Sequence, residues 1–572
     1  MKRYLPLLLT ALIPGAASAQ SAIDAYQISQ QDLRGTARFM SMGGAFGALG
    51  GDLSTLSQNP AGIGVYRSNE LGFTLDLQMN ESKSTSPSGG GESRNQTRFN
   101  LNNIGGVATI KLYNETMPNV NFGFTYNRAV SFNRKYSGGI PNLTNSLSNY
   151  IAGVANAAGL DEKDVKTTNT YDPYNPGSGK NIPWITVLGY DAYLIDPETT
   201  KDGTSWYGQF GKGTSGAGFF DVNEKGHVDE FNIALGGNIN NVVFWGMNFD
   251  IVSLDYKISS YWEENLQNAY VYNPNANELQ QMHSNWRLQD LYRLFGTGFN
   301  YQLGVIVKPI QELRLGLAFH TPTFYNLTER FYNEEIQYAY PFATDYATTN
   351  GGIPTDNDVD FNSPWKIIAS AAGVIGDKFI ISADYEWNCY KHMKYKNPTY
   401  AYGYDYGYDY GYDYDPWYWG GLWYGPKRAS VFDSMNYNDN PIEYTNQVIR
   451  EVYRNTSTIR VGAEYRVTPN FSVRLGYNHT TSPVTQKVRD NLVNIPASGT
   501  MASYRLDNAT NYVTAGLGYR YKGFYADLAY VWKHQSSEYF PFSPDPEDPM
   551  SAANSKITFN TNQVALSIGY RF

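Results

Sequence analysis

The sequence predicts an all-β transmembrane fold, a 14-stranded antiparallel outer-membrane β-barrel with an N-terminal helical hatch in its lumen and a helix-bearing extracellular loop. Three observations predict it: repeated alternation of apolar and polar side chains, strict alternation of short and long connections, and a secretory signal at the start. The alternation is clearest in the last ten residues, where small or polar residues share the face opposite the apolar one. The apolar face consists of Val564, Leu566, Ile568, Tyr570 and Phe572. For this segment alone, a strand of a soluble sandwich is the alternative.

The chain begins with a secretory signal. Lys2 and Arg3 form its basic start, Leu5 to Ile13 its apolar run, and Ala17-Ser18-Ala19 an A-x-A cleavage site. We therefore expect three parts in this order: a signal peptide (1–19), an N-terminal hatch or plug (20–68) and the barrel with its long loops (69–572).

Composition narrows the class of protein. A mean hydropathy of −0.46, without any run of 18 apolar residues, excludes a helical membrane protein. The 49 tyrosines and 54 glycines suit a barrel, although a tyrosine-rich soluble adhesin would have a similar composition. Loss of Lys2 and Arg3 with the signal changes the formal charge from −9 to −11, which argues against nucleic-acid binding.

Fourteen segments carry the alternation of period two. In a barrel their apolar face meets lipid and the opposite face lines the lumen. The predicted strands lie near residues 71–79, 97–111, 119–131, 229–239, 242–258, 293–308, 312–325, 364–376, 378–390, 456–468, 470–482, 507–521, 523–534 and 557–572.

Short connections alternate with long ones along this whole region. An even-stranded barrel has this asymmetry when both termini and all short turns lie in the periplasm, whereas a soluble two-sheet protein has no reason to separate loop lengths in this way. The short connections lie at residues 114–118, 240–241, 308–311, 376–377, 468–470 and 522–523.

The connection 133–228 is too long to lack structure of its own in a compact protein. Apolar residues at helical spacing predict an amphipathic helix there, and a second apolar stretch, Trp184 to Ile195, would pack against it. The residues of the first stretch are Leu143, Leu147, Ile151, Val154 and Ala158. One hypothesis is that the two elements form a greasy extracellular surface on which Leu143, Leu147, Ile151 and Val154 capture a substrate. The other is that they pack on each other and fold the loop.

A second long loop spans residues 391–455 and is rich in Tyr, Gly and Asp. Gly-Tyr-Asp-Tyr recurs through Tyr402 to Asp415, which is a low-complexity pattern. Its tyrosines and carboxylates suit sugars, cations or a flat aromatic ligand, but a solvated and variable loop tip is the simpler hypothesis. We therefore assign no ligand to this loop.

The segment between the signal and the first strand does not alternate and is rich in small residues. A barrel of fourteen strands has a lumen wide enough to conduct solutes unless it is occupied, which favours a compact plug. The segment contains Gly35-Thr36-Ala37, Met42-Gly43-Gly44-Ala45, Asp52 and Asn59-Pro60-Ala61-Gly62. This combination resembles the FadL/TodX (OmpP1) family of outer-membrane transporters for hydrophobic compounds. The resemblance extends to the strand count, the helix-bearing loop and the aromatic C-terminus.

The resemblance implies a barrel blocked by a hatch whose Asn-Pro-Ala motif takes part in gating. Here that motif is Asn59, Pro60 and Ala61, followed by Gly62. It further implies passive transport of long-chain fatty acids or aromatic compounds, captured by extracellular loops and released sideways through a gap in the wall. Sideways release preserves roughly 0.8 kcal/mol for each buried methylene, which passage through a charged lumen would forfeit.

Several charged residues fall on the lumen face of the predicted strands. We expect most of them to satisfy one another and the hatch. They are Arg314, Arg460, Glu464, Arg466, Arg474, Arg520 and Asp527.

The tyrosine-rich loop departs from the fatty-acid branch of the family and leaves the substrate open. The chain is similar to Bacteroidetes-type members that are sometimes labelled haem receptors, so its histidines are candidate axial ligands. They occur one at a time, which favours ordinary polar positions and predicts no metal site. The histidines are His227, His283, His320, His392, His479 and His534.

Two other classes of function compete with transport. A surface-display or adhesin barrel would need no motif-bearing plug, and an enzyme is not expected because neither G-x-S-x-G nor H-E-x-x-H occurs. We expect a monomer in the outer membrane of a Gram-negative bacterium, with no cofactor and no nucleic acid. The expected partners are a hydrophobic small-molecule ligand, outer-membrane lipid and the barrel assembly machinery, which would engage the C-terminal strand.

Overall fold

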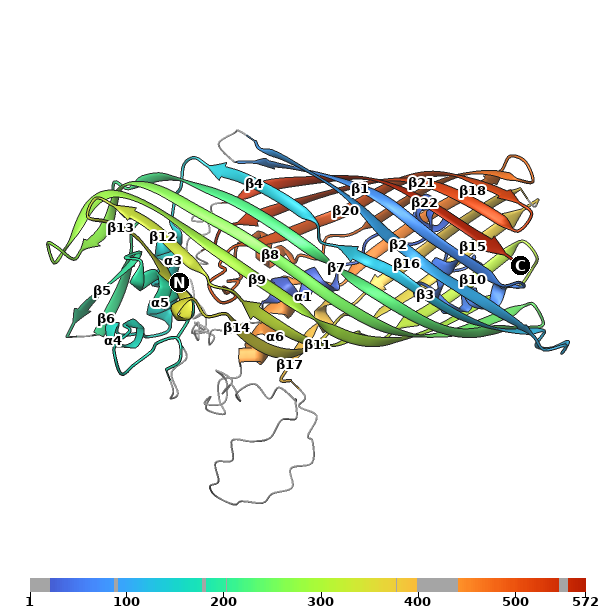
Figure 1. The fold of residues 1–572 in the computed structure, drawn as a ribbon, viewed down its shortest axis with the longest axis horizontal. Coiled ribbons are helices and arrows are strands. Elements are labelled where there is room, and N and C mark those ends of the chain that lie inside the picture. Colours follow the sequence, from blue (N-terminus) through green and yellow to red (C-terminus); the bar gives the residue numbers. More distant parts are fainter. Residues whose placement is uncertain are drawn as a thin grey trace, which may run out of the picture.

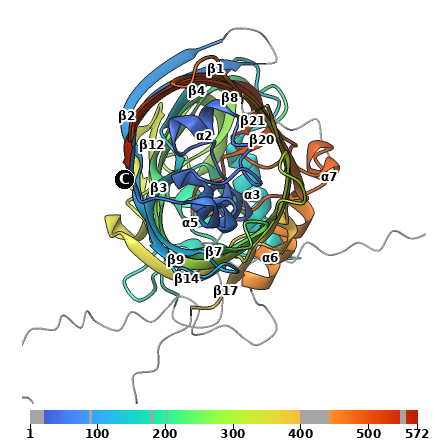
Figure 2. The same ribbon diagram turned by 90° about the vertical axis from the view of Figure 1, so that its right-hand side faces the viewer.

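A computed structural model describes residues 21–86, 91–176, 182–201, 203–376, 378–398, 441–544 and 554–572. Within these residues, fourteen strands pair antiparallel into a closed barrel (Figures 1 and 2). The predicted signal peptide and the Gly-Tyr-Asp-Tyr repeats fall outside the described residues. None of the described helices is both long and apolar enough to cross a membrane.

The barrel strands follow the predicted alternation, and each overlaps its predicted segment. In chain order they are β1 (Glu70–Thr85), β2 (Ser93–Lys111), β3 (Asn119–Ser131), β7 (Ser215–Ile239), β8 (Val243–Asn273), β9 (Glu278–Val307), β10 (Leu313–His320), β15 (Lys366–Ile375), β16 (Phe379–Asn388), β18 (Thr456–Arg466), β19 (Phe471–Thr480), β20 (Tyr504–Tyr521), β21 (Phe524–Phe540) and β22 (Ser555–Arg571). Pairing of β1 with β22, from Glu70↔Arg571 to Thr85↔Lys556, closes the barrel.

Shorter strands continue the wall at the end that carries the long loops. They are β4 (Arg134–Ile140), β11 (Phe324–Phe331), β12 (Glu335–Tyr340), β13 (Ala343–Thr348), β14 (Thr355–Asn362) and β17 (Lys394–Lys396). The break between β10 and β11 contains Pro322 and the break between β14 and β15 contains Pro364. Proline donates no backbone hydrogen bond to a ladder, which accounts for the interruption of the strands at both positions.

The outer surface of the barrel is apolar where the sequence places lipid. The five apolar residues of the last strand are exposed, from 36% for Val564 to 58% for Phe572. Their neighbours Gln563, Ala565 and Ser567 are buried on the lumen side. Lipid must cover this outer surface, because an apolar belt of this extent would not stay monomeric in water.

The N-terminal segment lies inside the barrel, as Figure 2 shows. It comprises α1 (Ala22–Ser29), α2 (Ala37–Ser41) and two 3-10 helices, η1 (Leu53–Ser57) and η2 (Pro60–Val65). Every residue of α1 is buried. We call residues 21–66 the hatch.

The loops carry the remaining helices. They are α3 (Leu147–Ala157), α4 (Glu162–Val165), α5 (Trp184–Asp191), α6 (Pro441–Val452), α7 (Gln486–Arg489) and the 3-10 helices η3 (Thr349–Gly352) and η4 (Tyr390–His392). The loop 133–228 also contains a small separate sheet of β5 (Ile195–Thr200) and β6 (Gly203–Gly208). The helix predicted in this loop is therefore present as α3.

Most lumen charges satisfy one another and the hatch, as predicted. Arg474 joins Glu464, at 2.7 Å, to Asp527, at 2.6 Å, and Arg38 of α2 approaches Glu464 to 2.9 Å. All three wall side chains of this cluster are at least 97% buried. Arg314 likewise donates to the Leu49 carbonyl of the hatch at 2.6 Å. The charges therefore bind the hatch to the wall.

We expect the Arg474→Met variant to destabilise the barrel, because it leaves Glu464 and Asp527 buried without their shared cation. Breaking a buried ion pair in this way costs about 3–5 kcal/mol. The measurement is the apparent melting temperature in detergent, followed by the heat-dependent shift in gel mobility. Adding Glu464→Gln and Asp527→Asn to Arg474→Met should restore much of the loss, and a single variant that melts like the parent would contradict the role of this cluster.

Candidate functional site

The Asn-Pro-Ala-Gly motif forms the start of η2. The Asn59 side chain accepts a hydrogen bond from the Ala61 amide at 3.1 Å and donates one to the Gly47 carbonyl at 2.5 Å. Pro60 occupies the first helical position, where a missing amide hydrogen costs nothing and the fixed φ suits the helix. The motif thus ties the two halves of the hatch together, and all four of its residues are buried.

Glycines of the wall face the hatch backbone. A Cβ atom at Gly246 would lie 2.1 Å from the Pro60 carbonyl oxygen, and one at Gly304 would lie 2.0 Å from the Asn59 side-chain oxygen. The same holds at four other wall glycines, each with 2.2–2.4 Å to a hatch atom: Gly316, Gly462, Gly476 and Gly516. Real side chains do not reach such distances, so the hatch fits only because these wall positions are bare.

Two polar wall residues hold the chain that precedes the motif. Asp384 of β16 accepts hydrogen bonds from the Gly47 amide at 3.0 Å and from the Gln58 side chain at 2.7 Å. The His320 ring bonds the Gln58 carbonyl at 2.8 Å. We call these contacts the Asp384 latch. Sequence analysis did not assign these two roles, and its one available signal was that both residues point into the lumen in their strands.

A polar cavity of about 160 Å³ lies between α1, the segment that follows it and the wall. Several of its charged residues have polar partners: Arg460 lies 3.0 Å from Glu386, and Lys366 donates to the Gln31 side chain at 2.6 Å. Its lining also includes the polar residues Asn127, Asn300, Gln302, Thr321, Asn388, Thr456, Thr458, Asn478 and Thr480. The cavity is therefore a poor place for a long apolar chain.

Aromatic rings join α1 to η4 and to Tyr453, the residue that follows α6. The Tyr26 ring stacks on Tyr453 with 5.1 Å between centroids and lies 5.4 Å from Tyr390. Asp24 of α1 is buried in the same region, and burial raises the pKa of its carboxyl group. Sequence analysis missed α6. The signal that could have revealed this helix is the helical spacing of its apolar residues Val448, Ile449 and Val452.

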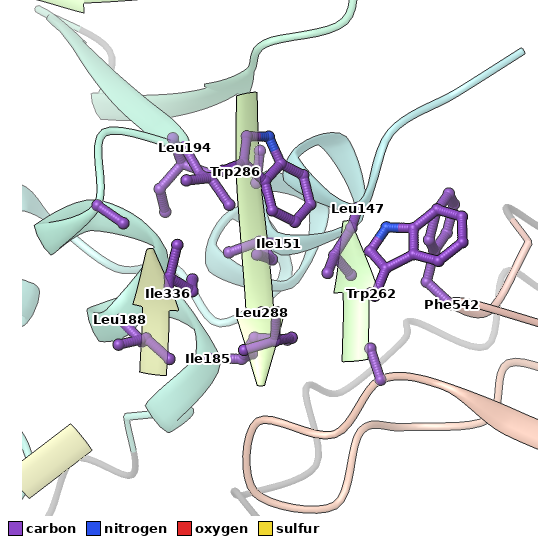
Figure 3. Packing of buried hydrophobic residues seen from close by; sticks show 14 of the residues in the cluster. Leu147, Ile151, Ile185, Leu188, Leu194, Trp262, Trp286, Leu288, Ile336 and Phe542 are labelled. Atoms are coloured by element: carbon purple, nitrogen blue, oxygen red, sulfur yellow. The ribbon is translucent and has the colours of Figure 1, made fainter. Parts of the chain in front are cut away.

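Figure 3 shows where two of the four predicted capture residues, Leu147 and Ile151, lie. Leu147 and Ile151 of α3 are 0% exposed, and they share a cluster with Leu188 of α5 and with Trp262 and Trp286 of the barrel. Leu143 is buried in the same cluster, and Val154 is partly exposed. These contacts agree with the hypothesis that the two apolar stretches of the loop pack on each other and fold it. Capture by the four residues stays a prediction.

One line of the wall lacks a continuous ladder. β2 pairs with β1 from Ser93 onward, but it pairs with β3 only from Asn103↔Asn127 to Lys111↔Asn119. Residues 93–102 of β2 therefore have no partner on β3, although β3 itself continues to pair with β7 as far as Ser131. We call this discontinuity the β2–β3 seam.

Side chains close the upper part of the seam in place of a ladder. From β1, Asn80 donates to the Asn133 carbonyl at 2.6 Å and Ser82 to the Lys135 carbonyl at 2.5 Å. Ser84 of β1 likewise donates to the Ser137 carbonyl at 2.5 Å. The chain that follows β3, residues 133–137, therefore lies along the side chains of β1. On the outer face, exposed Phe99 and Leu101 of β2 border the seam.

The lower end of the seam lies beside the polar cavity. Residues 127–129 of β3 line the cavity, and Asn127 also bonds the Asn103 side chain at the last paired position. Arg34 of the hatch lines the cavity too and donates to Asn102 of β2 at 3.2 Å. Hatch, cavity and seam are thus contiguous.

The histidines do not gather. His227 lies 3.3 Å from Asp229, and His283, His479 and His534 each bond an asparagine side chain. Across the part of the chain that the structure describes, no group of three or more His, Cys, Asp or Glu residues is arranged to hold a metal ion.

Comparison with known proteins gives a family. Residues 213–572 match the family model described as outer membrane protein transport protein (OMPP1/FadL/TodX). Among solved structures, similarity extends to a Pseudomonas aeruginosa FadL homologue (12% identity, TM-score 0.48, 95% of this chain and 100% of that chain). It also extends to the P. putida toluene transporter TodX (12% identity, TM-score 0.44) and the Ralstonia pickettii toluene transporter TbuX (12% identity, TM-score 0.41). Each of these two matches covers 95% of this chain and 99% of the other chain. No curated protein matches the chain.

We expect Asp384→Asn to loosen the hatch. The carboxylate accepts a hydrogen bond from the Gln58 side-chain amide, whereas an asparagine would place its own NH₂ group against that donor. The measurement is hydrogen exchange over residues 41–62, which should speed up by about tenfold, the loss of roughly one charged hydrogen bond. Asp250→Asn is the matched control, since Asp250 is equally buried but bonds Asn248 and Gln302 of the wall. Equal exchange in both variants would contradict the latch.

Proposed function

Because the chain belongs to the OMPP1/FadL/TodX family of outer membrane transport proteins, we propose that it carries hydrophobic small molecules passively across the outer membrane of a Gram-negative bacterium. The proposed ligands are long-chain fatty acids or aromatic compounds, captured at the extracellular loops and released sideways into the bilayer. The Asn59–Gly62 motif gates this passage by holding the hatch in place.

The β2–β3 seam is the observation that carries the proposal. It is a length of wall held by a few side-chain hydrogen bonds. It parts more easily than a continuous ladder because it has fewer bonds, each contributing about 1 kcal/mol. It adjoins both the hatch and the exposed apolar residues Phe99 and Leu101. A ligand that leaves here passes from the lumen directly into lipid.

The straight route through the barrel is disfavoured by the same structure. Below the cavity, a ligand would have to displace a hatch that is bonded to the wall through Arg38, Arg314 and Asp384. An apolar ligand would gain no contact that offsets these losses, whereas the bilayer preserves roughly 0.8 kcal/mol for each methylene.

Ligand class is tested by binding to the purified barrel in detergent. The probes are a fluorescent long-chain fatty acid, a monoaromatic hydrocarbon and haem, each titrated separately. Saturable binding of either hydrophobic probe supports transport of that class. Binding of haem alone, removed by a single histidine substitution, would replace the proposal with a haem receptor, and binding of none would favour surface display.

Locking the seam should block release. In a Cys389→Ser background, Asn103→Cys and Asn127→Cys would form a disulfide across the last paired position, where opening of the ladder begins. We expect oxidation to reduce uptake of the bound probe class into cells several-fold, and a reductant to restore it.

The control disulfide joins Ala371→Cys and Ala383→Cys. These residues are also directly paired cross-strand partners, but they lie in the continuous β15–β16 ladder and do not line the polar cavity. Oxidation of this pair should leave uptake unchanged. Normal uptake through the oxidised variant would show that release does not require the β2–β3 ladder to open at Asn103 and Asn127.

Two loop variants separate capture from folding. Val154→Asn should weaken probe binding by up to about tenfold, the value of one buried valine, without changing hydrogen exchange in residues 143–160. Ile151→Ala should speed that exchange, because it empties a fully buried position at a cost of about 2–5 kcal/mol. If Val154→Asn binds the probe like the parent, its side chain takes no part in capture.

A further inference from the structure

A row of basic residues crosses four neighbouring strands on the outside of the barrel. Lys225 of β7 pairs with Lys257 of β8, Lys257 pairs with Arg293 of β9, and Arg293 pairs with Arg330 of β11. These strands lie side by side on the face toward the viewer in Figure 1. We call Lys225, Lys257, Arg293 and Arg330 the basic row.

The basic row points outward. On each strand its residue shares the face of an exposed or half-exposed apolar residue of the lipid-facing belt. The belt residues on these strands are Phe231, Ile251, Phe299 and Phe324, which are themselves cross-strand neighbours. The basic row therefore lies on the same surface as the belt, displaced toward the long loops.

The aromatic residue Phe295 on β9 indicates the level of the basic row relative to the membrane. Phe295 is the next outward residue below Arg293, about 7 Å along the strand. The guanidinium carbon atoms of Arg293 and Arg330 lie 4.4 Å and 5.5 Å from the Phe295 ring centroid. Aromatic rings at this level mark the boundary between hydrocarbon and headgroups.

Like charges directly opposite each other destabilise a sheet, and the basic row contains three such pairs in succession. Two carboxylates offset part of the repulsion. Asp255 lies 2.8 Å from Arg293 and 3.4 Å from Lys257, and Asp356 lies 2.7 Å from Arg330. Within the row four cations face two carboxylates, and the Lys257 side chain is 48% exposed. Asp358 and Asp360 of β14 share the outer face farther down and bond Thr328 and Asn326 of β11, so the surplus of positive charge lies on β7, β8 and β9.

We propose that the basic row is a binding site for phosphate groups of outer-leaflet lipid. Guanidinium groups bind phosphate oxygens in pairs and lysines add point charges, so a phosphorylated headgroup matches the row. The acyl chains of the same lipid would lie on the belt residues of β7, β8 and β9: Phe231, Ile251 and Phe299. The carboxylates and Phe295 hold the two arginines in place before the lipid binds, which lowers the entropic cost of binding.

The test compares lipid binding by the whole barrel and by a variant without the basic row. The variant carries Lys225→Gln, Lys257→Gln, Arg293→Gln and Arg330→Gln, and a second variant adds Asp255→Asn and Asp356→Asn so that no carboxylate loses its partner. The probes are a bisphosphorylated glycolipid and its dephosphorylated counterpart, each titrated into the barrel in neutral-lipid nanodiscs.

We expect both variants to bind the bisphosphorylated glycolipid at least about tenfold more weakly than the parent, since each basic residue near a charged headgroup layer contributes measurably to affinity. Binding of the dephosphorylated glycolipid should be equal in all three proteins. The matched control removes four lysines at the short-turn end, Lys111, Lys308, Lys378 and Lys522, and should bind both lipids like the parent.

Three results would overturn the proposal. The first is unchanged affinity for the bisphosphorylated glycolipid in both variants. The second is an equal loss in the short-turn control, which would indicate a response to overall charge. The third is binding of inorganic phosphate alone as tightly as the glycolipid, which would indicate a free-anion site. None of these results depends on what the barrel transports.

Discussion

Closure of the backbone ladder is the constraint on which the rest of this structure depends. In hydrocarbon, a strand edge without a partner leaves amide and carbonyl groups unsatisfied at several kcal/mol each. Pairing of β22 with β1 removes the two edges that a linear chain would otherwise expose. The same constraint makes the β2–β3 seam informative, because the protein leaves residues 93–102 of β2 without a ladder on one side and closes the gap with side chains from β1.

A closed barrel of this size needs an occupied lumen, and two different kinds of contact occupy it. Near the short turns, hatch backbone lies directly against bare wall glycines such as Gly246 and Gly476, and buried ion pairs join Arg38 to Glu464. Near the mouth, rings and aliphatic side chains of α1 and α6 pack on the wall. The polar cavity lies between the two and beside the seam.

The capture hypothesis shows what a periodic pattern of apolar residues can predict and what it cannot. Spacing of apolar residues in the loop 133–228 predicts a helix, and α3 is that helix. The same spacing does not say which surface the apolar side chains meet. Leu147 and Ile151 face α5 and the extended strands β8 and β9, because those strands run far beyond the membrane and offer Trp262 and Trp286 as partners. Alternation is weaker in that part of the strands, which is why their predicted ends at 258 and 293 fall short.

Features that repeat locally can be read from the amino-acid sequence alone. They are the fourteen amphipathic strands, the separation of short from long connections, the outward and inward faces, and the position of the Asn59–Gly62 motif. These follow from period-two alternation and turn chemistry, which each segment carries alone. Three-dimensional contacts were needed to show which lumen residues meet the hatch, as Asp384 and Gly304 do, that α6 shares a core cluster with α1, and where the β2–β3 ladder ends. Those contacts join residues hundreds of positions apart, and their partners are fixed by barrel register and closure, which leave no local pattern to read.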